Sequence, residues 1–441
     1  MKEQSSIPTS KVERASKFVR TGAKVGGNYV KHYAKRFITG DASREDLDQA
    51  NAEDIYGSLS ELKGSALKVA QMLAMDKNIL PTAYQNQFSM AQYSAPPLSY
   101  PLVVKTFKEQ LGKLPTEAFE SFTKSAVNAA SIGQVHKGTI GDREFAVKVQ
   151  YPGVAGSVRS DLKLVKPFAL RLVKLNEQEL DHYMEEVEER LLEETDYKLE
   201  LLRSKQISEA CAHIPNLTFP KYYAELSSER ILTMDWLQGL HLKEFLKTNP
   251  SQNLRNQMGQ AMWDFYNHQV HNLLQVHADP HPGNFLMMEN GSLGVIDFGC
   301  VKVIPEDFYR TYFQLMREDL LWKEEELVAA FHDLCFLYED DPADYKVLYV
   351  DVFKQMMQLL GAPFHKESFD FANEEYFKKI FDLGEGISKR KEFKNSKHPR
   401  GSRHGLYINR TYFGLYNLLH DLGAEVRTTK PEWLGEVVVP G

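Results

Sequence analysis

The sequence is poor in cysteine, and its few cysteines are not placed for a cross-link or a metal site. Cys211, Cys300 and Cys335 are the only three in 441 residues, and they form no Cys-x-x-Cys pair or Cys/His cluster. An odd number of widely separated cysteines favours neither a disulfide framework nor a zinc site. We therefore expect a reducing compartment and a cytoplasmic protein.

Long apolar runs are also missing, and the net charge is small. No stretch approaches the roughly 18–20 apolar residues that a membrane-spanning helix needs, and no signal-peptide pattern is present. Any membrane contact should then be peripheral, at the inner membrane. A formal net charge of −7 gives no strong field toward nucleic acid, so we expect no nucleic-acid partner.

The first 40 residues, by contrast, are basic, with nine Lys or Arg against two acids. Helical spacing places Val12, Ala15, Phe18 and Val19 on one face, with basic residues around it. A basic amphipathic helix is typical of a segment that contacts a membrane surface. The same pattern fits a solvated helix packed on its own protein, and both interpretations remain open.

The pattern of the chain then changes several times. Apolar residues recur at helical spacing in 54–75, strand-like segments occupy 122–153, an acidic helical stretch covers 176–206, and helices dominate after 241. Strands first and helices later predict an α+β protein with two lobes of unequal composition, the second of them mostly helical. We divide the chain into a basic segment, a helical extension, an N-lobe and a C-lobe: 1–50, 51–100, 101–235 and 236–441.

Five polar residues stand in the order and spacing of a phosphoryl-transfer site. Lys148 lies in the strand-like "FAVKV", Glu194 in an acidic helix, and Asp279, Asn284 and Asp297 follow in "HADPHPGN" and "IDFG". A nucleotide needs a cation on its phosphates, oxygen ligands for Mg²⁺, and a carboxylate near the nucleophile. We therefore predict ATP and Mg²⁺ as cofactors.

Each of these residues has an expected role. Lys148 should contact the phosphates and needs an acidic partner, for which Glu194 is the best candidate. Asp279 is the expected catalytic carboxylate, while Asn284 and Asp297 should hold the metal. Glu194 could instead be an ordinary exposed residue without a role in the site, because most glutamates in acidic helices are exposed. The combination of all five residues is what favours the site over chance.

Residues for binding the nucleotide come from two further segments. The turn "NAASIGQVH" at 128–136 occupies the position of a glycine-rich phosphate loop, but alanines and a serine replace most of the glycine. Alanine restricts the backbone, so we expect an altered nucleotide pose. The residues assigned to nucleotide binding here are Ala129, Ala130 and Ser131, together with Asp235 and Leu237 after a later strand-like run.

Several of these motifs together resemble the UbiB (AarF) family of atypical protein-kinase-like proteins. They extend over most of the chain, from about residue 50 onward. They are "KVAQ" at 68–71, the Ala-rich turn at 128–136, "AVKVQYPGV" at 146–154, "EETDYKLE" at 193–200, "HADPHPGN" and "IDFG".

The resemblance implies a protein-kinase-like two-lobe fold with an N-terminal helical extension and a predominantly helical C-lobe. Members of the family bind Mg-nucleotide and are thought to act as ATPases or unconventional kinases that support ubiquinone-type lipid biosynthesis at a membrane. Lys68 and Gln71 would occlude the substrate site, with Glu200 as the partner of Lys68 and Asp196 as the intervening acid. Ala70 stands where the family motif has glycine, a change that keeps the helix but puts a close backbone contact in doubt.

Two other functions remain as alternatives. "HADPHPGN" also resembles the loop of aminoglycoside and choline kinases, so a small-molecule kinase ranks second. A pseudokinase that uses nucleotide as a switch ranks third, because all five site residues are compatible with binding alone. Beyond the nucleotide, the expected partners are an isoprenoid lipid or quinone precursor and a membrane surface.

Overall fold

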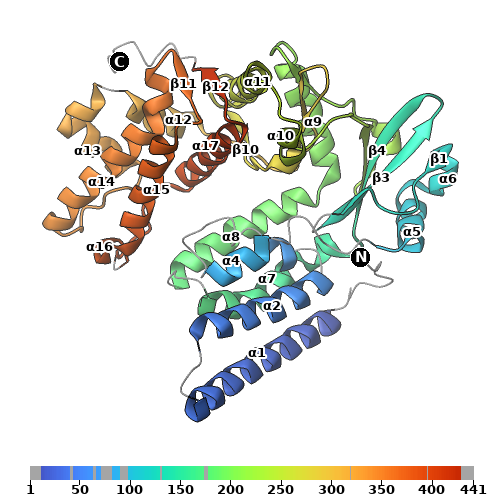
Figure 1. Ribbon diagram of the computed structural model, residues 1–441, viewed down its shortest axis with the longest axis horizontal. Helices are drawn as coiled ribbons and strands as arrows, with labels where there is room; N and C mark the ends of the chain where they lie inside the picture. The colour runs from blue at the N-terminus through green and yellow to red at the C-terminus, as the bar shows by residue number, and fades with distance from the viewer. Residues whose placement is uncertain are drawn as a thin grey trace. The chain divides into compact units, whose positions relative to one another are not determined.

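The computed structural model separates the chain into two compact units, which we describe one at a time (Figure 1). The first comprises Met1–Leu202 and Lys221–Trp236, and the second comprises Arg203–Pro220 and Leu237–Gly441. No helix in the described part of the chain is both long and apolar enough to span a membrane. The structure describes residues 11–39, 43–62, 66–70, 82–89, 98–129, 132–172, 177–317, 319–394 and 396–428.

Helices form one part of the first unit. Helix α1 packs on α2 and on α7, and α7 packs in turn on α8 (Figure 1). The described helices of this unit are α1 (Lys11–Thr39), α2 (Arg44–Leu62), α4 (Thr82–Ser89), α5 (Tyr100–Leu111), α6 (Pro115–Ala118), α7 (Val154–Leu172), α8 (Glu177–Glu194) and the start of α9 (Tyr197–Cys211), with η2 (Ala224–Leu226).

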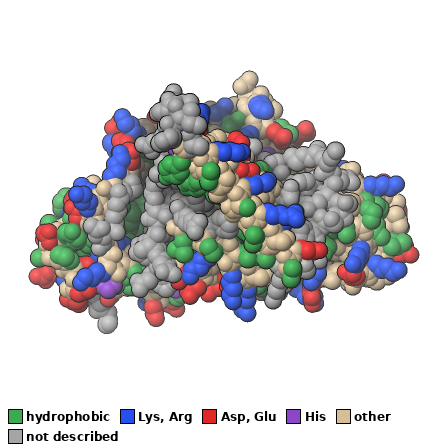
Figure 2. Space-filling model, turned by 90° about the horizontal axis from the view of Figure 1, so that it is seen from below, with side chains coloured by type: hydrophobic (Ala, Val, Ile, Leu, Met, Phe, Trp, Pro, Cys, Tyr) green, Lys and Arg blue, Asp and Glu red, His purple; other side chains and the backbone are tan. Residues whose placement is uncertain are grey.

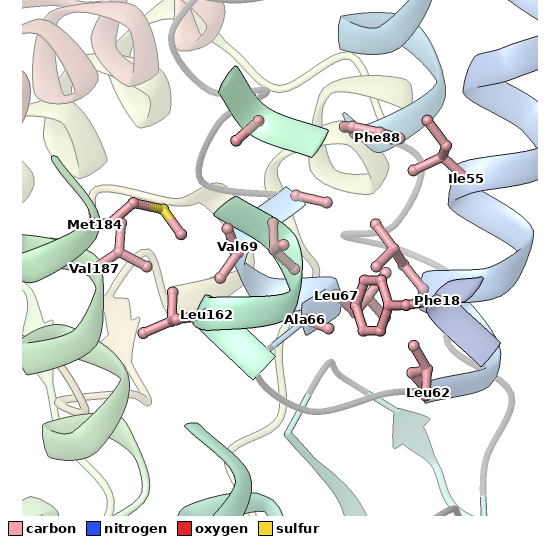
Figure 3. Close-up of a cluster of buried hydrophobic side chains, with 14 of the residues drawn as sticks. Phe18, Ile55, Leu62, Ala66, Leu67, Val69, Phe88, Leu162, Met184 and Val187 are labelled. Carbon is pink, nitrogen blue, oxygen red and sulfur yellow. The ribbon is translucent and has the colours of Figure 1, made fainter. Parts of the chain in front are cut away.

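The short helical segment 66–70 is buried among these helices. Its apolar residues Ala66, Leu67, Val69 and Ala70 are at most 2% exposed, and they pack with side chains of α1, α2, α4, α7 and α8 (Figure 3). The buried face expected within 54–75 is therefore confirmed for the described residues. Ala70 is only 2% exposed, so its methyl group is accommodated in the core.

A buried ion pair anchors α1 to this helical core. The guanidinium of Arg14 donates to both carboxylate oxygens of Asp161 on α7 at 2.6 Å, and also to the carbonyl of Leu62 at 3.0 Å. Ser157 donates to the same carboxylate at 2.9 Å. The buried side of α1 thus includes Arg14 and Phe18, whereas Val12 and Val19 are 80% and 72% exposed. The single apolar face expected for α1 is wrong, since its members lie on different sides of the helix.

An antiparallel sheet forms the rest of the first unit. Its strand order is β1-β3-β4-β6, and β2 pairs with β3. Phe107 of α5 and Phe119 pack against Phe145 and Val147 of β4 to form the core on one face. The strands are β1 (Ser121–Phe122), β2 (Asn128–Ala129), β3 (Gly133–Ile140), β4 (Arg143–Gln150) and β6 (Ile231–Asp235).

The second unit is mostly helical and carries four short strand pairings. Helix α11 is its buried centre, and among the residues packed in it Trp263 is fully buried. The helices are α10 (Leu242–Lys247), α11 (Gln252–His271), α12 (Glu306–Phe313), α13 (Glu324–Asp333), α14 (Ala343–Gly361), α15 (Glu374–Lys389), α16 (Lys391–Lys394) and α17 (Arg403–Leu422), with η3 (Pro282–Asn284), η4 (Gln314–Met316), η5 (Leu320–Trp322) and η6 (Ala362–His365). The strands are β5 (Leu217–Thr218), β7 (Gln275–His277), β8 (Phe285–Met287), β9 (Leu293–Val295), β10 (Val301–Val303), β11 (Ser368–Asp370) and β12 (Glu425–Arg427).

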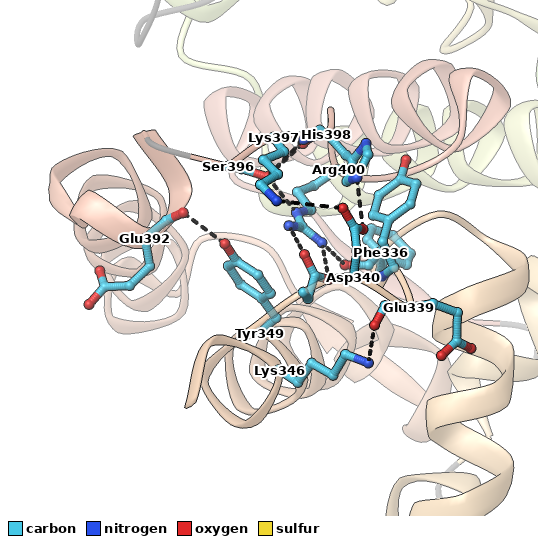
Figure 4. A network of polar contacts seen from close by, with 12 residues as sticks. Phe336, Glu339, Asp340, Lys346, Tyr349, Glu392, Ser396, Lys397, His398 and Arg400 are labelled. Carbon is cyan, nitrogen blue, oxygen red and sulfur yellow. Dashed lines mark hydrogen bonds and ion pairs between the residues drawn. The ribbon is translucent and has the colours of Figure 1, made fainter. Parts of the chain in front are cut away.

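A polar network holds the segment that precedes α17 (Figure 4). Arg400 donates to the two carboxylate oxygens of Asp341 at 2.6 and 2.5 Å, and its guanidinium lies 4.1 Å from the ring centroid of Tyr349. The Tyr349 hydroxyl donates to the carbonyl of Glu392 at 2.7 Å. Two-point pairing of arginine with a carboxylate fixes direction as well as distance. The start of α17 is therefore tied to α14.

Candidate functional site

In the first unit, strand β4 presents Lys148 to a helix glutamate. Lys148 lies between Val135 of β3 and Leu232 of β6 in the sheet, so its backbone is held on both sides. Its ammonium donates to both carboxylate oxygens of Glu200, at 2.9 and 3.1 Å. The Glu200 side chain is 1% exposed and that of Lys148 is 16% exposed. A charge this deeply buried needs such a partner.

A break between α8 and α9 places Glu200 where Lys148 can reach it. Helix α8 ends at Glu194, and α9 begins at Tyr197. The carboxylate of Asp196 accepts the backbone N–H groups of Lys198 and Leu199 at 3.1 and 3.0 Å, which is how an aspartate caps the start of a helix. Glu200 therefore lies in the first turn of a new helix.

Strand β4 also fixes the break itself. The side-chain amide of Gln150, two residues after Lys148, donates to the carbonyl of Thr195 at 2.9 Å. The ring of Tyr197 lies under the Lys148 ammonium, 5.1 Å from its centroid. A cation over an aromatic face adds a modest attraction of about 0.5–2 kcal/mol. The sequence interpretation assigned no role to Gln150 or Tyr197, although both lie within the motifs at 146–154 and 193–200.

The other glutamate of the acidic segment pairs with a different lysine. The Glu194 carboxylate forms an ion pair with the Lys68 ammonium at 3.1 Å. The guanidinium of Arg190, one helical turn earlier, lies 3.9 Å from the same carboxylate. Lys68 comes from the buried segment 66–70, whose apolar neighbours hold it in place. Both side chains are largely buried, at 20% exposed for Lys68 and 9% for Glu194.

These two contacts correct the predicted pairing. We expected Lys148 with Glu194 and Lys68 with Glu200, but the partners are exchanged: Lys148 pairs with Glu200 and Lys68 with Glu194. The sequence analysis treated 176–206 as one helical stretch. The Asp196 cap instead starts a second helix, so Glu194 and Glu200 lie on different helices.

The Ala-rich turn is only partly described. Ala129 ends β2 and pairs with Gln134 of β3, and it is half-buried. Ala130 and Ser131 lie outside the described residues, as does Gln71, so their predicted roles stay predictions. Gly133 begins β3, and a Cβ at this position would meet the Tyr197 hydroxyl at 2.8 Å. Glycine is therefore required where this strand passes α9.

In the second unit, two strand pairings bring Asp279, Asn284 and Asp297 together. Strands β8 and β9 form an antiparallel hairpin in which Phe285 faces Val295, so Asn284 lies beside Ile296. The backbone N–H of Ile296 donates to the carbonyl of Asn284 at 3.1 Å. The interval of thirteen residues between Asn284 and Asp297 is therefore the length of this hairpin.

The loop from Asp279 to Asn284, called the catalytic loop below for its predicted role, is held by hydrogen bonds within it. The amide of Asn284 donates to the carbonyl of Asp279 at 2.8 Å, and its nitrogen is 3.4 Å from a carboxylate oxygen of that residue. The imidazole of His281 accepts the N–H of Gly283 at 3.0 Å and so caps η3. Asp297 accepts the N–H of Gly299 at 2.9 Å. The loop is thus a defined turn, in which His281 has a structural role as the cap of η3.

The oxygen-bearing side chains of this loop suit Mg²⁺ rather than a softer metal. Mg²⁺ prefers carboxylate and amide oxygens, which Asp297 and Asn284 supply. No group of three or more His, Cys, Asp or Glu residues gathers as a metal cluster in the described part of the chain. His277 is fully buried, with its ring nitrogen 3.3 Å from the Tyr266 hydroxyl, so it fits a structural role.

A fully buried tyrosine, Tyr266, lies near Asp279. Burial above all, together with the nearby charges of Asp279 and Cys300, raises the pKa of Tyr266 well above its usual value. Tyr266 is therefore expected to stay a neutral hydroxyl, 3.3 Å from a ring nitrogen of His277.

The two remaining predicted nucleotide residues differ in their surroundings. Asp235 ends β6, and its carboxylate accepts the Tyr223 hydroxyl at 2.7 Å and the N–H of Lys221 at 3.0 Å. Leu237 packs near Gly294 of β9, where an added Cβ would meet it at 3.2 Å. The side chain of Asp235 is thus engaged within its own sheet, and the predicted contact of either residue with nucleotide stays a prediction.

A strand lysine paired with a helix glutamate, an H-x-D-x-x-x-x-N loop and a following D-F-G define a kinase-like α+β protein, which confirms the expected fold class. The ABC1 atypical kinase-like domain matches residues 90–332, more than half of the sequence. The chain belongs to this family, and the resemblance to the UbiB (AarF) group is confirmed.

Named relatives agree with this assignment. The mitochondrial atypical kinase COQ8B of Danio rerio is 27% identical over 389 residues, covering 86% of this chain and 61% of that protein. AarF domain-containing protein kinase 1 of Xenopus laevis is 32% identical over 263 residues, covering 57% of this chain and 50% of that protein. The chain thus spans between half and about six tenths of the length of these two relatives.

A solved structure also resembles most of the chain. It is the complex of Rv3197 with erythromycin from Mycobacterium tuberculosis, which is 26% identical, has a TM-score of 0.59, and covers 90% of this chain and 97% of that chain. The similarity therefore extends beyond the residues that match the family domain.

Proposed function

We propose that this chain is an atypical kinase or ATPase that uses Mg-ATP and supports the biosynthesis or handling of an isoprenoid-quinone lipid at a membrane surface. The observation that carries the proposal is the two-point ion pair between Lys148 and Glu200. Phosphoryl transfer needs a fixed cation for the phosphates, and such a pair fixes one. The family membership and the COQ8 names of relatives support the link to quinone lipids.

Each residue of the site has a role in this proposal. Asn284 and Asp297 would hold Mg²⁺, which would neutralise phosphate charge. Asp279 would orient the attacking hydroxyl or water and accept its proton, since a carboxylate does this in kinase loops. Lys148 would neutralise phosphate oxygens, and Glu200 keeps its ammonium in position. The Ala-rich turn would restrict the nucleotide pose.

The pairing of Lys68 with Glu194 supports a regulatory role. Lys68 extends from a buried helical segment to the last residue of α8, two residues before the Asp196 cap. Replacing either charge would leave its partner largely buried and unpaired. We propose that this pair holds the α8–α9 break in one geometry and so restrains the site, with Gln71 as the family's second occluding residue.

The outer face of α1 supports contact with a membrane surface. Val12, Val19, Val30 and Tyr33 are 61–80% exposed, and their spacing places them on one side of the helix. Figure 2 shows Lys and Arg side chains interspersed with hydrophobic ones on the face it views. Exposed apolar side chains beside basic ones match an anionic lipid surface.

One experiment tests the main proposal. Wild type and Asp297→Asn are compared for Mg-dependent ATP hydrolysis, with and without liposomes and a phenol that mimics a quinone precursor, and exposed Asp344→Asn is the matched control. We expect hydrolysis in wild type and control that rises with lipid and vanishes in Asp297→Asn. Nucleotide binding without turnover would instead establish the pseudokinase alternative.

A small-molecule kinase is the second candidate. Its support is the "HADPHPGN" loop, and the structural relative solved with erythromycin shows that a similar chain can accept a small molecule. Phosphorylated choline, aminoglycoside or macrolide, detected by mass spectrometry after incubation with Mg-ATP, would favour this function over lipid-linked ATPase activity.

A further inference from the structure

Helix α17 lies directly against the catalytic loop, at a position where only glycine fits. A Cβ added at Gly414 would be 2.1 Å from Cγ and 2.8 Å from Cβ of Pro280. Pro280 is the residue immediately after Asp279. Its ring is rigid, so it cannot swing away as the end of a flexible side chain would. The helix backbone therefore sets how far this part of the loop can move.

A second contact from the same helix reaches the other side of Asp279. Tyr407, seven residues before Gly414 and on the same face of the helix, is 4% exposed and packs with Ala278 and Cys300. Ala278 immediately precedes Asp279, and Cys300 follows the D-F-G triplet. The N–H of Ala278 donates to the carbonyl of Cys300 at 2.9 Å. One helix thus contacts both flanks of Asp279 and the end of the metal-side loop.

Hydrogen bonds to α11 and α14 hold the opposite side of α17, so the helix cannot shift away from the loop. The hydroxyl of Tyr412 lies 3.2 Å from both the side-chain oxygen of Asn267 and a ring nitrogen of His271 on α11. Tyr416 donates to the carbonyl of Leu360 at 2.8 Å. Both tyrosines are at most 3% exposed. A close-packed interior transmits such a restraint instead of absorbing it.

We propose that Gly414 and Tyr407 are positioning residues that hold the catalytic loop from behind and so set the place of Asp279. This inference rests on the proposed function only through the role of Asp279. Neither residue needs to contact nucleotide. Residues of α17 lie beyond 332, the end of the matched family domain, and they carry no motif that would have singled them out.

The test inserts one methyl group and then makes room for it. Gly414→Ala, Pro280→Gly and the double variant are compared with Gly384→Ala, a matched control in helix α15 where an added Cβ meets nothing within 4 Å. Glycine at 280 removes both the Cγ and the Cβ that the new methyl group would meet. Because alanine favours a helix over glycine by ~1 kcal/mol, propensity alone would stabilise both single glycine variants. Only Gly414→Ala inserts its methyl group against the loop.

Two readouts are expected to move together. The kcat for ATP hydrolysis should fall about tenfold to a hundredfold in Gly414→Ala, since a misplacement near 1 Å has that cost, while the KM for ATP changes by no more than about threefold. Hydrogen exchange in peptides covering 276–286 should become faster, because the N–H groups of Ala278, His281 and Asn284 are bonded there. In chains that already carry Pro280→Gly, the added Gly414→Ala should change neither readout by more than about threefold.

The outcomes that oppose the proposal are distinct from failure of the proposed function. If Gly414→Ala matches Gly384→Ala in both readouts, or acts equally with and without Pro280→Gly, α17 does not position the loop. If wild type hydrolyses no ATP, the proposed function fails, and the exchange data alone decide the positioning role. Should Gly414→Ala not fold, the double variant must fold for the proposal to stand.

Discussion

Lys148 and Glu200 are joined by two hydrogen bonds of 2.9 and 3.1 Å, while Glu194, six residues earlier, pairs with Lys68 at 3.1 Å. Two lysines from distant segments thus engage two glutamates of one acidic stretch without sharing a partner. The Asp196 cap makes this possible, because it ends one helix direction and begins another. The two ion pairs can therefore be tested separately by mutation.

Glu200→Gln should weaken nucleotide binding and turnover much more than Glu194→Gln. Without the Glu200 charge, the Lys148 ammonium loses its fixed position, and one charge of a mostly buried pair is left uncompensated. Breaking such a pair costs about 3–5 kcal/mol of folding stability. Calorimetric binding of Mg-ATP and chemical unfolding measure both effects, and equal losses in the two variants would contradict the corrected pairing.

Lys68→Ala should release a restraint if its pair with Glu194 is regulatory. We expect a change in the affinity for Mg-ATP, or the appearance of autophosphorylation that wild type lacks. Glu194→Gln serves as the partner control, because breaking the same pair from the other side should act in the same direction. Unchanged affinity together with unchanged autophosphorylation would remove the inhibitory role of Lys68.

Arg14→Met should destabilise the helical part of the first unit. It leaves the Asp161 carboxylate, which is 0% exposed, without its two-point partner. The expected loss is about 3–5 kcal/mol, measured by urea unfolding. The control is Arg20→Met, an exposed position on the same helix, where a change within about 0.5 kcal/mol is expected.

Acid should unfold the second unit through His271. Burial lowers the pKa of His271 from 6.5 to about 3, so the folded protein keeps this imidazole neutral while the unfolded chain takes up a proton below pH 6.5. The stability associated with the neutral form is therefore lost as pH falls from about 6.5 toward 3, by at most about 1.4 kcal/mol for each pH unit. Urea unfolding at pH 7 and pH 5 measures this slope.

The comparison variant for this pH effect is His271→Gln. Glutamine can still bond to Tyr309 and Tyr412, the partners of the imidazole at 2.9 and 3.2 Å, but it does not titrate. The variant should lose much of the dependence on pH between 7 and 5. Burial also lowers the pKa of His268, with His213 adding to the effect, so a smaller slope of the same sign should remain.

Vesicle binding should depend on the outer face of α1. Val19→Glu replaces a residue that is 72% exposed, so it should not disturb the core, yet it should reduce flotation with vesicles of anionic phospholipid. Val347→Glu is the control, since Val347 is 73% exposed on α14 in the second unit. Equal flotation of both variants would argue that α1 does not contact lipid.

The sequence was sufficient to propose the site residues and insufficient to predict their contacts. Lys148, Asp279, Asn284 and Asp297 could be proposed because a kinase-like site requires particular groups at particular intervals. The pairing of Glu194 and Glu200 could not be found by extending one helix, since a single cap redirects the chain. In "EETDY", Asp196 preceding a helical run was the available signal for that cap.

Contacts made by residues outside any sequence motif were still harder to predict. The apolar residues of α1 were expected on one face, but the buried side includes Arg14, because Asp161 supplies a matching charge 147 positions away in the chain. Likewise, the requirement for glycine at 414 arises from a proline more than a hundred residues earlier. A local sequence pattern cannot predict a contact with a residue more than a hundred positions away in the chain.

The close approach of Gly414 to Pro280 has a practical meaning for anyone who shortens this protein. A fragment cut at residue 332 would retain the matched domain end and every recognisable signature. It would nevertheless lack α17, which we propose to hold Asp279 in place, and the side chains of Phe364, Phe371 and Tyr416 that pack on Trp263. Such a fragment is expected to carry all the motifs of a kinase but to lack part of the core on which its loop rests.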